Sequence, residues 1–268
     1  MHLIFDIGGT HIRGAISDGR TLIRKKIVDT PQSFDEGMSV ISSLKKELEQ
    51  DDQIHVTLCG IAGVFQSNKQ SLFVSPNLPD WVGKPLQKEL ETICSMPVHI
   101  ENDAALAGLG EAVYGAVRDH TIVMYYTIGT GIGGVRIVNK KIDAHLYGFE
   151  PGQQIISKTD RKTLEQFTSG GSIERSKGIN PSNIHDEEFW QLIAKDLSVG
   201  IYNSMLHWSP DVIVLGGGLI NQNVLSIEAI KKELSNLNTM YPEIPDIKKS
   251  EFGDESGLMG GIIYANSI

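Results

Sequence analysis

The sequence has little of several features that would each indicate a particular class of protein. Only two of its 268 residues are cysteines, Cys59 and Cys94, which are too few for a disulfide framework and too far apart for a metal pair. No apolar run approaches the roughly 18 residues of a membrane helix. The 24 Lys and Arg residues face 33 Asp and Glu, giving a formal net charge of −9. Without a basic block, this balance disfavours binding to a nucleic acid or to an anionic membrane.

The start of the chain also lacks a targeting signal. Met1 and His2 lead directly into an apolar segment, without the charged region and cleavage site of a secretory peptide. Together with the scarcity of cysteine, this predicts a soluble, cytoplasmic protein. Hydrophobic residues make up 40% of the chain, which is ample for a buried core in one large domain or in two lobes.

Strand and helix patterns alternate along the chain, which indicates an α/β fold. The prolines of residues 75–81 predict an irregular surface loop anchored by Trp81. Apolar spacing predicts helices at about 35–50, 103–116, 187–207, 224–237 and 257–265, and strands at 3–7, 11–17, 54–59, 122–126, 135–138 and 211–215.

A short pattern recurs near the middle of the chain. Residues 5–10 (Phe-Asp-Ile-Gly-Gly-Thr) and 126–131 (Tyr-Thr-Ile-Gly-Thr-Gly) each join two strand-like segments through a glycine turn. This recurrence favours two similar lobes, each opening with a glycine hairpin, over two unrelated β-turns. No low-complexity linker separates the halves.

The first glycine motif, residues 6–10, has the composition of a phosphate-binding turn. Glycines in a tight turn let backbone N–H groups approach phosphate oxygens, and they permit positive φ angles. Asp6, just before the turn, could hold Mg²⁺ directly or through water. The motif is not a Walker loop, since no Gly-Lys-Ser/Thr follows, nor a dinucleotide fingerprint, since a strand follows instead of a helix. A hairpin without a ligand is the alternative.

Two further glycine runs add to this pattern. Residues 129–134 contain four glycines, more than a hairpin turn requires, which favours a second phosphate cradle with a hydroxyl from Thr130. Residues 215–218 (Leu-Gly-Gly-Gly) follow an apolar strand, where a flat adenine or ribose could lie close to the backbone. An ordinary strand-to-helix turn is the alternative for this third run.

Asp103 follows a strand-like segment and opens an alanine-rich helical run. There it feels the positive end of the helix dipole, which predicts an ionised carboxylate at neutral pH. Such a carboxylate can take the proton of a sugar hydroxyl while a phosphoryl group is transferred to the oxygen. Asp is also a common helix cap, so for this residue alone capping is the simpler interpretation.

The motifs occur in one order, and in that order the chain resembles the ROK family (repressors, open reading frames and sugar kinases) of the actin-like ATPase superfamily almost end to end. The residues that carry the resemblance are 6–10, 59–64 (Cys-Gly-Ile-Ala-Gly-Val), 76–81 (Pro-Asn-Leu-Pro-Asp-Trp), 101–105 (Glu-Asn-Asp-Ala-Ala), 127–134, 163–165 (Thr-Leu-Glu), 169–170 (Ser-Gly), 215–218 and 258–261 (Leu-Met-Gly-Gly). The resemblance implies two ribonuclease-H-like lobes with a cleft between them, which we place at residues 1–102 plus 254–268 and at 103–253.

The resemblance also implies an ATP-dependent sugar kinase, glucokinase-like and homodimeric, with Asp103 as general base. Asp6 would hold Mg²⁺ through water. The nucleotide would be bound by Gly8, Gly9, Thr10, Gly129, Thr130 and Gly131 at the phosphates and by Gly217 and Gly218 near the nucleoside. The sugar would be bound by Gly63, Asn77, Asn102, Asp103, Glu150, Gln153 and Glu165.

Two departures from the family pattern concern the sugar end. The family commonly shows Glu-x-Gly-His, whereas residues 150–153 read Glu-Pro-Gly-Gln. Many members carry a Cys-x-Cys-Gly-x-x-Gly-Cys zinc loop before the Leu-Glu pair, and here residues 157–163 contain no cysteine. A tetrahedral structural zinc needs those ligands, so we expect no zinc. Gln153 can still hydrogen-bond a sugar hydroxyl.

Two other functions stay open at this point. Gln153 and the missing zinc loop suggest a catalytically weak sugar-binding relative, although a protein that only binds sugar needs no phosphate cradle. A sugar-sensing regulator of the same family would carry an N-terminal helix-turn-helix region, whereas here the hairpin begins at residue 3. Candidate sugars differ by one centre or substituent, so the arrangement of Asn77, Glu150, Gln153 and Glu165 decides among them.

Overall fold

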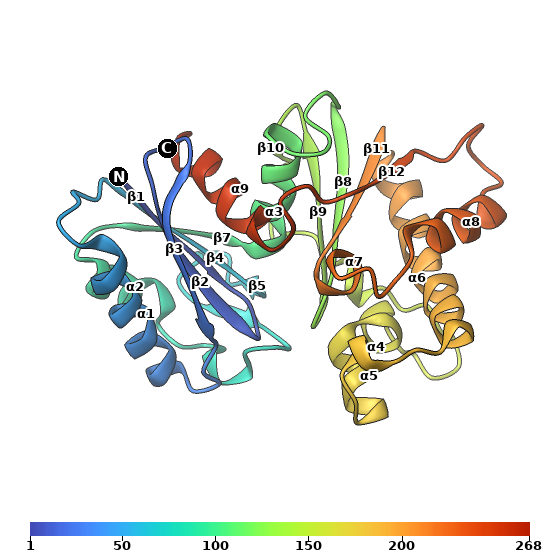
Figure 1. The fold of residues 1–268 in the computed structure, drawn as a ribbon, viewed down its shortest axis with the longest axis horizontal. Helices are drawn as coiled ribbons and strands as arrows, with labels where there is room; N and C mark the ends of the chain where they lie inside the picture. Colours follow the sequence, from blue (N-terminus) through green and yellow to red (C-terminus); the bar gives the residue numbers. More distant parts are fainter. The chain divides into compact units, whose positions relative to one another are not determined.

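The computed structural model describes residues 1–268, which fold into two compact units of mixed α/β structure (Figure 1). The first unit comprises Met1–Gly110, Ala144–Gly148 and Glu255–Ile268, and the second comprises Glu111–Asp143 and Phe149–Asp254. Each unit contains one five-stranded sheet. The sequence placed the first crossing between lobes at residue 102, whereas the chain leaves the first unit after Gly110.

The sheet of the first unit has the strand order β3-β2-β1-β4-β7. β1 and β2 form the antiparallel hairpin that the first glycine turn predicted, and β4 and β7 extend the sheet in parallel with β1. The strands are β1 (His2–Ile7), β2 (His11–Ser17), β3 (Leu22–Asp29), β4 (Val56–Ile61) and β7 (Val98–Asn102).

The sheet of the second unit repeats this plan in the order β10-β9-β8-β11-β12. It too opens with an antiparallel hairpin, β8 and β9, and continues with two strands parallel to β8. The predicted internal repeat is therefore confirmed at the level of topology. The strands are β8 (Ile122–Ile128), β9 (Ile132–Val138), β10 (Lys141–Ile142), β11 (Val212–Gly216) and β12 (Asp246–Lys249).

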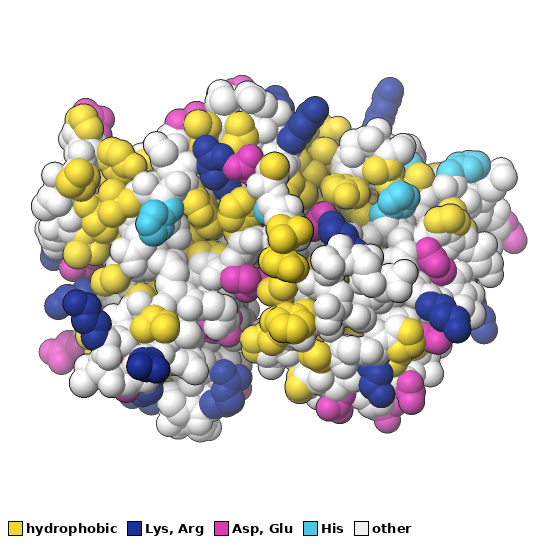
Figure 2. Space-filling model, turned by 180° about the vertical axis from the view of Figure 1, so that it is seen from behind, with side chains coloured by type: hydrophobic (Ala, Val, Ile, Leu, Met, Phe, Trp, Pro, Cys, Tyr) yellow, Lys and Arg dark blue, Asp and Glu magenta, His cyan; other side chains and the backbone are white.

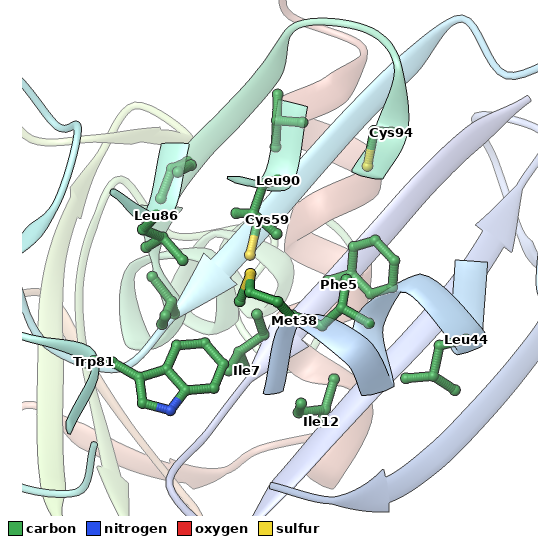
Figure 3. Packing of buried hydrophobic residues seen from close by; sticks show 14 of the residues in the cluster. Phe5, Ile7, Ile12, Met38, Leu44, Cys59, Trp81, Leu86, Leu90 and Cys94 are labelled. Atoms are coloured by element: carbon green, nitrogen blue, oxygen red, sulfur yellow. The ribbon is translucent and has the colours of Figure 1, made fainter. Parts of the chain in front are cut away.

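One face of the first sheet is covered by α1 (Phe34–Glu49) and α2 (Leu86–Cys94). Figure 3 shows Phe5, Ile7 and Ile12 of the sheet directed toward Met38 and Leu44 of α1. Both cysteines belong to this core, and burial raises the pKa of the Cys94 thiol to about 11. Their thiols are therefore protonated and serve as packing groups.

The proline-rich segment 75–81 is only partly irregular. It follows a small hairpin of β5 (Val64–Phe65) and β6 (Leu72–Val74), and Pro79–Trp81 forms a 3₁₀ turn, η1. Our prediction of no regular structure was wrong here, because a proline is compatible with the first position of a helical turn. The predicted anchor is confirmed, since Trp81 is fully buried edge-to-face against Phe34 with ring centroids 5.5 Å apart.

The other face of the first sheet is covered by the C-terminal helix α9 (Ser256–Ala265), whose Leu258 and Ile262 pack on β1 and β2. Helix α3 (Asp103–Val113) packs against α9 at very short range, because a Cβ atom at Gly260 would lie 1.7 Å from the carbonyl oxygen of Leu106. This close packing holds the start of α3 in the first unit, which explains why the boundary falls later than predicted.

The helices of the second unit surround a core on one face of its sheet, built mainly on α6 and α8. None of the helices is both long and apolar enough to cross a membrane. On the face in Figure 2, Lys and Arg side chains lie in small separate groups. The helices are α4 (Leu164–Thr168), α5 (Gly170–Lys177), α6 (Glu187–Trp208), α7 (Gly218–Asn221) and α8 (Ile227–Leu237), with 3₁₀ turns η2 (Pro151–Gln153), η3 (Pro181–Asn183) and η4 (Gly253–Glu255).

Candidate active site

The predicted site residues of the first unit gather at one edge of its sheet. In the register of the parallel strands, Asp6 lies beside Gly60, and Gly60 lies beside Glu101. The motifs at residues 8–10, 61–63 and 102–103 therefore sit at the carboxyl ends of neighbouring strands. Ligands of open α/β sheets bind in this position.

The carboxylate of Asp6 is almost fully buried and lies between glycines of two neighbouring elements. A Cβ atom at Gly257 of α9 would lie 3.0 Å from both carboxylate oxygens, and one at Gly60 would lie 3.7 Å from Oδ1. Nη1 of Arg13 lies 3.5 Å from Oδ2. Arg13 was not predicted from the sequence, although the hairpin around residues 8–10 pairs it directly with Asp6.

Asp103 is the first residue of α3, as predicted, but the side chain that caps the N-terminus of the helix belongs to Asn102. Oδ1 of Asn102 accepts the N–H of Ala105 at 3.0 Å, which is the N-cap bond. Oδ1 of Asp103 accepts the adjacent N–H of Ala104 at 2.9 Å. The capping interpretation therefore belongs to Asn102, and it does not account for Asp103.

The pKa of Asp103 is raised to about 6. Burial is the largest cause, opposed by backbone N–H groups of α3 and by the positive charge of Arg13. The side chain still keeps part of its surface open to solvent. We expected the helix dipole to govern this group, whereas the cost of desolvating the charge outweighs it. At pH 7 the carboxylate is nevertheless mostly ionised, with a pKa near the range that suits a general base.

Asn102 and Gly63 are joined by a hydrogen bond from Nδ2 of Asn102 to the carbonyl oxygen of Gly63, at 3.3 Å. Gly63 has a φ of 136°, and a Cβ atom there would lie 2.7 Å from the carbonyl oxygen of Val74. Asn77 lies against the first glycine hairpin, because a Cβ atom at Gly9 would come within 2.4 Å of the Asn77 Cβ. The structure thus brings the predicted residues of the first unit together.

An ion pair that the sequence analysis missed supports this edge of the sheet. Nζ of Lys69, in the turn between β5 and β6, lies 2.8 Å from Oε2 of the buried Glu101. Oε1 of Glu101 accepts the N–H of Asn102 at 2.9 Å. The pair links the small hairpin to the strand that carries Asn102. Residues 32 positions apart form it, so no local sequence signal points to it.

The glycine turns of the two hairpins do not use left-handed backbone, and the close approach to a neighbouring residue is at Gly9. Gly8, Gly9, Gly129 and Gly131 are not among the residues with positive φ, so these turns do not use the conformational freedom that glycine permits. In the first hairpin the N–H of Gly8 donates to His11 at 3.0 Å, and the hydroxyl of Thr30 donates to the Gly8 carbonyl at 2.8 Å. These bonds fix the turn that precedes Thr10.

Backbone hydrogen bonds from the start of α5 stabilise the turn of the second hairpin. The N–H of Gly170 donates to the carbonyl of Gly129 at 2.7 Å, and that of Gly171 donates to Thr130 at 3.1 Å. A Cβ atom at Gly171 would lie 2.5 Å from the Thr130 carbonyl oxygen. Glycine is therefore required at this helix start for packing, a role that the sequence analysis did not assign.

The third glycine run faces the second hairpin within the same unit. Gly217 has a φ of 83°, and a Cβ atom there would lie 2.5 Å from the N atom of Ile128. A Cβ atom at Gly129 would lie 3.6 Å from the N atom of Gly218. Backbone thus meets backbone with no side chain between them, which is the arrangement that a nucleotide approaching the main chain requires.

The carboxylate of Glu165 has two protein donors in the second unit. Oε2 accepts the N–H of Ile132, at the end of the second glycine hairpin, at 2.7 Å. Oε1 accepts the side-chain amide of Gln153 at 3.3 Å. Glu165 lies in the first turn of α4, whose start is fixed by a capping box between Thr163 and Gln166. Gln153, at the sequence position where the family pattern has His, thus lies next to Glu165.

Glu150, the remaining predicted sugar ligand, is exposed and directly precedes η2. Its carbonyl oxygen accepts the N–H of Gln153 at 3.1 Å. This bond keeps Glu150 and Gln153 on the same turn. The structure therefore brings Glu150, Gln153 and Glu165 together within the second unit.

The residues present fit Mg²⁺ held with a nucleotide better than a metal held by the protein alone. No group of three or more His, Cys, Asp or Glu side chains could hold a metal ion. Mg²⁺ keeps several waters and needs only one or two carboxylates in addition to substrate phosphates, which the single carboxylate of Asp6 can satisfy. The absence of zinc stays a prediction.

Comparison with known proteins gives consistent results along the whole chain. The sequence profile of the ROK family matches residues 3–268. An N-acetyl-D-glucosamine kinase of Histophilus somni is 28% identical over 298 residues, which cover 97% of either chain.

Among solved structures, a ROK family glucokinase of Streptomyces griseus in complex with glucose and AMPPNP has a TM-score of 0.88 at 21% identity, over 100% of this chain and 99% of that one. A ROK family transcriptional regulator, a homologue of the E. coli MLC protein, has a TM-score of 0.79 at 16% identity, over 99% of this chain and 78% of the regulator. Both structures share the fold of this chain.

Proposed function

The chain belongs to the ROK family, and from that premise we propose that it transfers the γ-phosphoryl group of ATP to a hydroxyl of a hexose or hexose derivative. The proposal rests on the hydrogen bonding, the pKa and the position of the Asp103 carboxylate. Its carboxylate is not needed to cap α3, has a pKa raised to about 6 by burial, and lies at the carboxyl edge of the sheet near Asp6. These are properties of a general base rather than of a structural group.

In the proposed reaction, Asp103 accepts the proton of the sugar hydroxyl. The sugar oxygen forms a bond to the γ-phosphorus, the bond from this phosphorus to the β–γ bridging oxygen breaks, and ADP leaves. Asp6 would hold Mg²⁺ through water, and the ion would supply positive charge to neutralise the transferred group. Asn102 supports this arrangement, because its side chain joins the start of α3 to Gly63.

ATP is bound in this proposal by backbone of the three glycine runs. Gly8, Gly9 and Thr10 act from the first hairpin, and Gly129, Thr130 and Gly131 from the second. Gly217 and Gly218 lie near the nucleoside. The bare backbone between Gly129 and Gly218 supports this assignment.

In this proposal the far end of the sugar is bound by Glu150, Gln153 and Glu165 of the second unit, and Asn77 and Gly63 are the sugar ligands that the first unit contributes. Glu165 accepts two protein N–H donors and retains lone pairs for sugar hydroxyls. Because Gln153 donates to Glu165, it orients that carboxylate without a metal. An N-acetyl-D-glucosamine kinase and a glucokinase are among the proteins that this chain resembles, so both sugars belong in the first test.

The test is sugar-dependent release of ADP across a panel of hexoses and N-acetylhexosamines. A kinase forms ADP and sugar phosphate in equal amounts with at least one of them. A protein that only binds sugar binds a panel member but forms no sugar-dependent ADP. The regulator alternative has the support of a shared fold alone.

The rate is expected to fall on the acid side with a midpoint near pH 6. Asp103 acts as a base only when ionised, and its pKa is about 6, so turnover is lost as the pH falls through that value. The measurement is kcat/KM for the sugar between pH 3.5 and 9 at saturating nucleotide, in excess magnesium, because this ratio reports the pKa of the sugar-free enzyme. Circular dichroism at each pH shows that the fold is retained. A midpoint near pH 4 would show that burial does not govern the base.

Treatment with a chelator is expected to leave stability and sugar binding unchanged. Residues 157–163 carry no cysteine, so the contacts of Glu165 rest on Ile132 and Gln153 instead of on a metal site. The measurements are zinc content by mass spectrometry and Tm before and after dialysis against EDTA. One zinc per chain, or a loss of Tm on dialysis, would contradict the prediction. That the protein forms a homodimer remains a prediction, which analytical ultracentrifugation can test.

A further inference from the structure

The ion pair between Arg13 and Asp6 is built into the first glycine hairpin. The two residues are direct cross-strand partners on β2 and β1, so their side chains lie on the same face of the sheet. Only 17% of the Arg13 side chain and 12% of the Asp6 side chain are exposed. A cation is thus fixed at the buried edge where Asp6 and Asp103 are placed.

The second hairpin shows that this pair is not needed to build such a turn. In the repeat, Thr127 stands where Asp6 stands, and its cross-strand partner is Gly133. The second hairpin forms the same antiparallel pairing without either charge. The pair in the first hairpin therefore answers a local electrostatic need rather than a requirement of the fold.

The electrostatic need comes from the carboxylates of Asp6 and Asp103, which lie near each other in a partly buried part of the first unit. A Cβ atom at Gly60 would lie 3.7 Å from Oδ1 of Asp6 and 3.6 Å from the Cα of Asp103, so the two acidic residues flank one glycine. Burying two carboxylates at one edge of a sheet costs free energy, which a nearby positive charge offsets. The charge of Arg13 acts on both, since it contacts Asp6 and lowers the pKa of Asp103.

We propose that Arg13 is a positioning residue, an internal counterion that holds the carboxylates of Asp6 and Asp103 side by side in the orientation for phosphoryl transfer. The inference rests on the proposed kinase function. The contact of 3.5 Å between Nη1 and Oδ2 is long for a hydrogen bond. This contact therefore acts through charge, and we expect a lysine to replace the arginine in that role.

Two variants separate charge from packing. Arg13→Gln is expected to lower kcat by about 10-fold to 100-fold, with KM values for sugar and ATP within about threefold, whereas Arg13→Lys keeps kcat within about fivefold. If Arg13 had only a structural role, both variants would lose similar amounts of kcat, and the loss would follow the decrease in Tm. If Arg13→Gln does not fold, a folded Arg13→Lys that has lost more than 10-fold in kcat overturns the proposal on its own.

Binding of Mn²⁺ to the protein saturated with a non-hydrolysable ATP analogue, measured by electron paramagnetic resonance, gives a readout independent of turnover. Without the counterion, Arg13→Gln is expected to bind Mn²⁺ about tenfold more tightly than the wild type, and Arg13→Lys to match the wild type. Unchanged Mn²⁺ affinity and unchanged kcat in Arg13→Gln would refute the inference. A wild type that forms no sugar-dependent ADP would instead refute the proposed function, while the Mn²⁺ comparison still tests the counterion.

Discussion

Replacing Asp103 with asparagine is expected to lower kcat by about 10²-fold to 10⁴-fold, the usual contribution of a general base. The amide keeps the size of the carboxylate and can still accept the N–H of Ala104, but it takes no proton from the sugar. Affinity for ATP should stay within about threefold, because Asp103 is not among the nucleotide residues. Rapid-quench kinetics and calorimetric titration of the nucleotide measure the two quantities.

The same variant is expected to be more stable than the wild type above pH 6. The pKa of Asp103 is higher in the folded chain, about 6, than in the unfolded chain, so ionisation costs free energy of folding. The cost is present above pH 6 and vanishes as the pH falls toward 4. Asp103→Asn should therefore raise the free energy of unfolding by about 1–3 kcal/mol at pH 8 and by nothing at pH 4.

A neighbouring substitution supplies the matched control for stability. Asn102→Ala removes the N-cap bond to Ala105, so it should lower stability by about 1 kcal/mol at both pH values. If Asp103→Asn lost stability in the same way, Asp103 would be a structural residue. Near-normal turnover in Asp103→Asn would show that another group is the base.

Replacing Glu165 with glutamine is expected to raise the KM for the sugar by about 10-fold to 100-fold. Hydrogen bonds to a charged group contribute about 1.5–3 kcal/mol each, and the substitution removes the charge while keeping the size. The KM for ATP should stay within about threefold. Initial rates over a matrix of sugar and ATP concentrations give both constants.

The KM values of Glu165→Gln also test whether Glu165 only supports the second hairpin and does not bind the sugar. Its Oε2 accepts the N–H of Ile132, so a purely supporting role would raise the KM for ATP and leave that for sugar unchanged. Such a result would contradict our assignment. Glu188→Gln is the control, because Glu188 is exposed in the first turn of α6.

The sequence predicted the parts of the fold that local chemistry determines. The glycine turns at residues 8–10 and 129–131 predicted both hairpins, and apolar spacing predicted α1 and α6, because these signals lie within a few residues. It missed β3, α2 and β12, which are short or depend on neighbours for burial. It also placed the boundary before α3, since the packing of Gly260 on Leu106 joins distant segments.

The candidate site was predicted unevenly for the same reason. Motif residues such as Asp6 and Asp103 were found from order and composition. The partners that set their charge and orientation were not, because Lys69 reaches Glu101 across 32 positions. Arg13 was within reach, since the register of the hairpin places it opposite Asp6. Burial decided the pKa of Asp103, and burial is not visible in a sequence.

The central claim is that this chain moves a phosphoryl group from ATP to a sugar. The most direct measurement is ADP release by the wild type with each member of a hexose and N-acetylhexosamine panel, with Asp103→Asn run in parallel. We predict ADP and sugar phosphate in equal amounts with at least one sugar, and a loss of about 10²-fold or more in the variant. No sugar-dependent ADP with any member, from folded protein that binds both ATP and a sugar, would contradict the account.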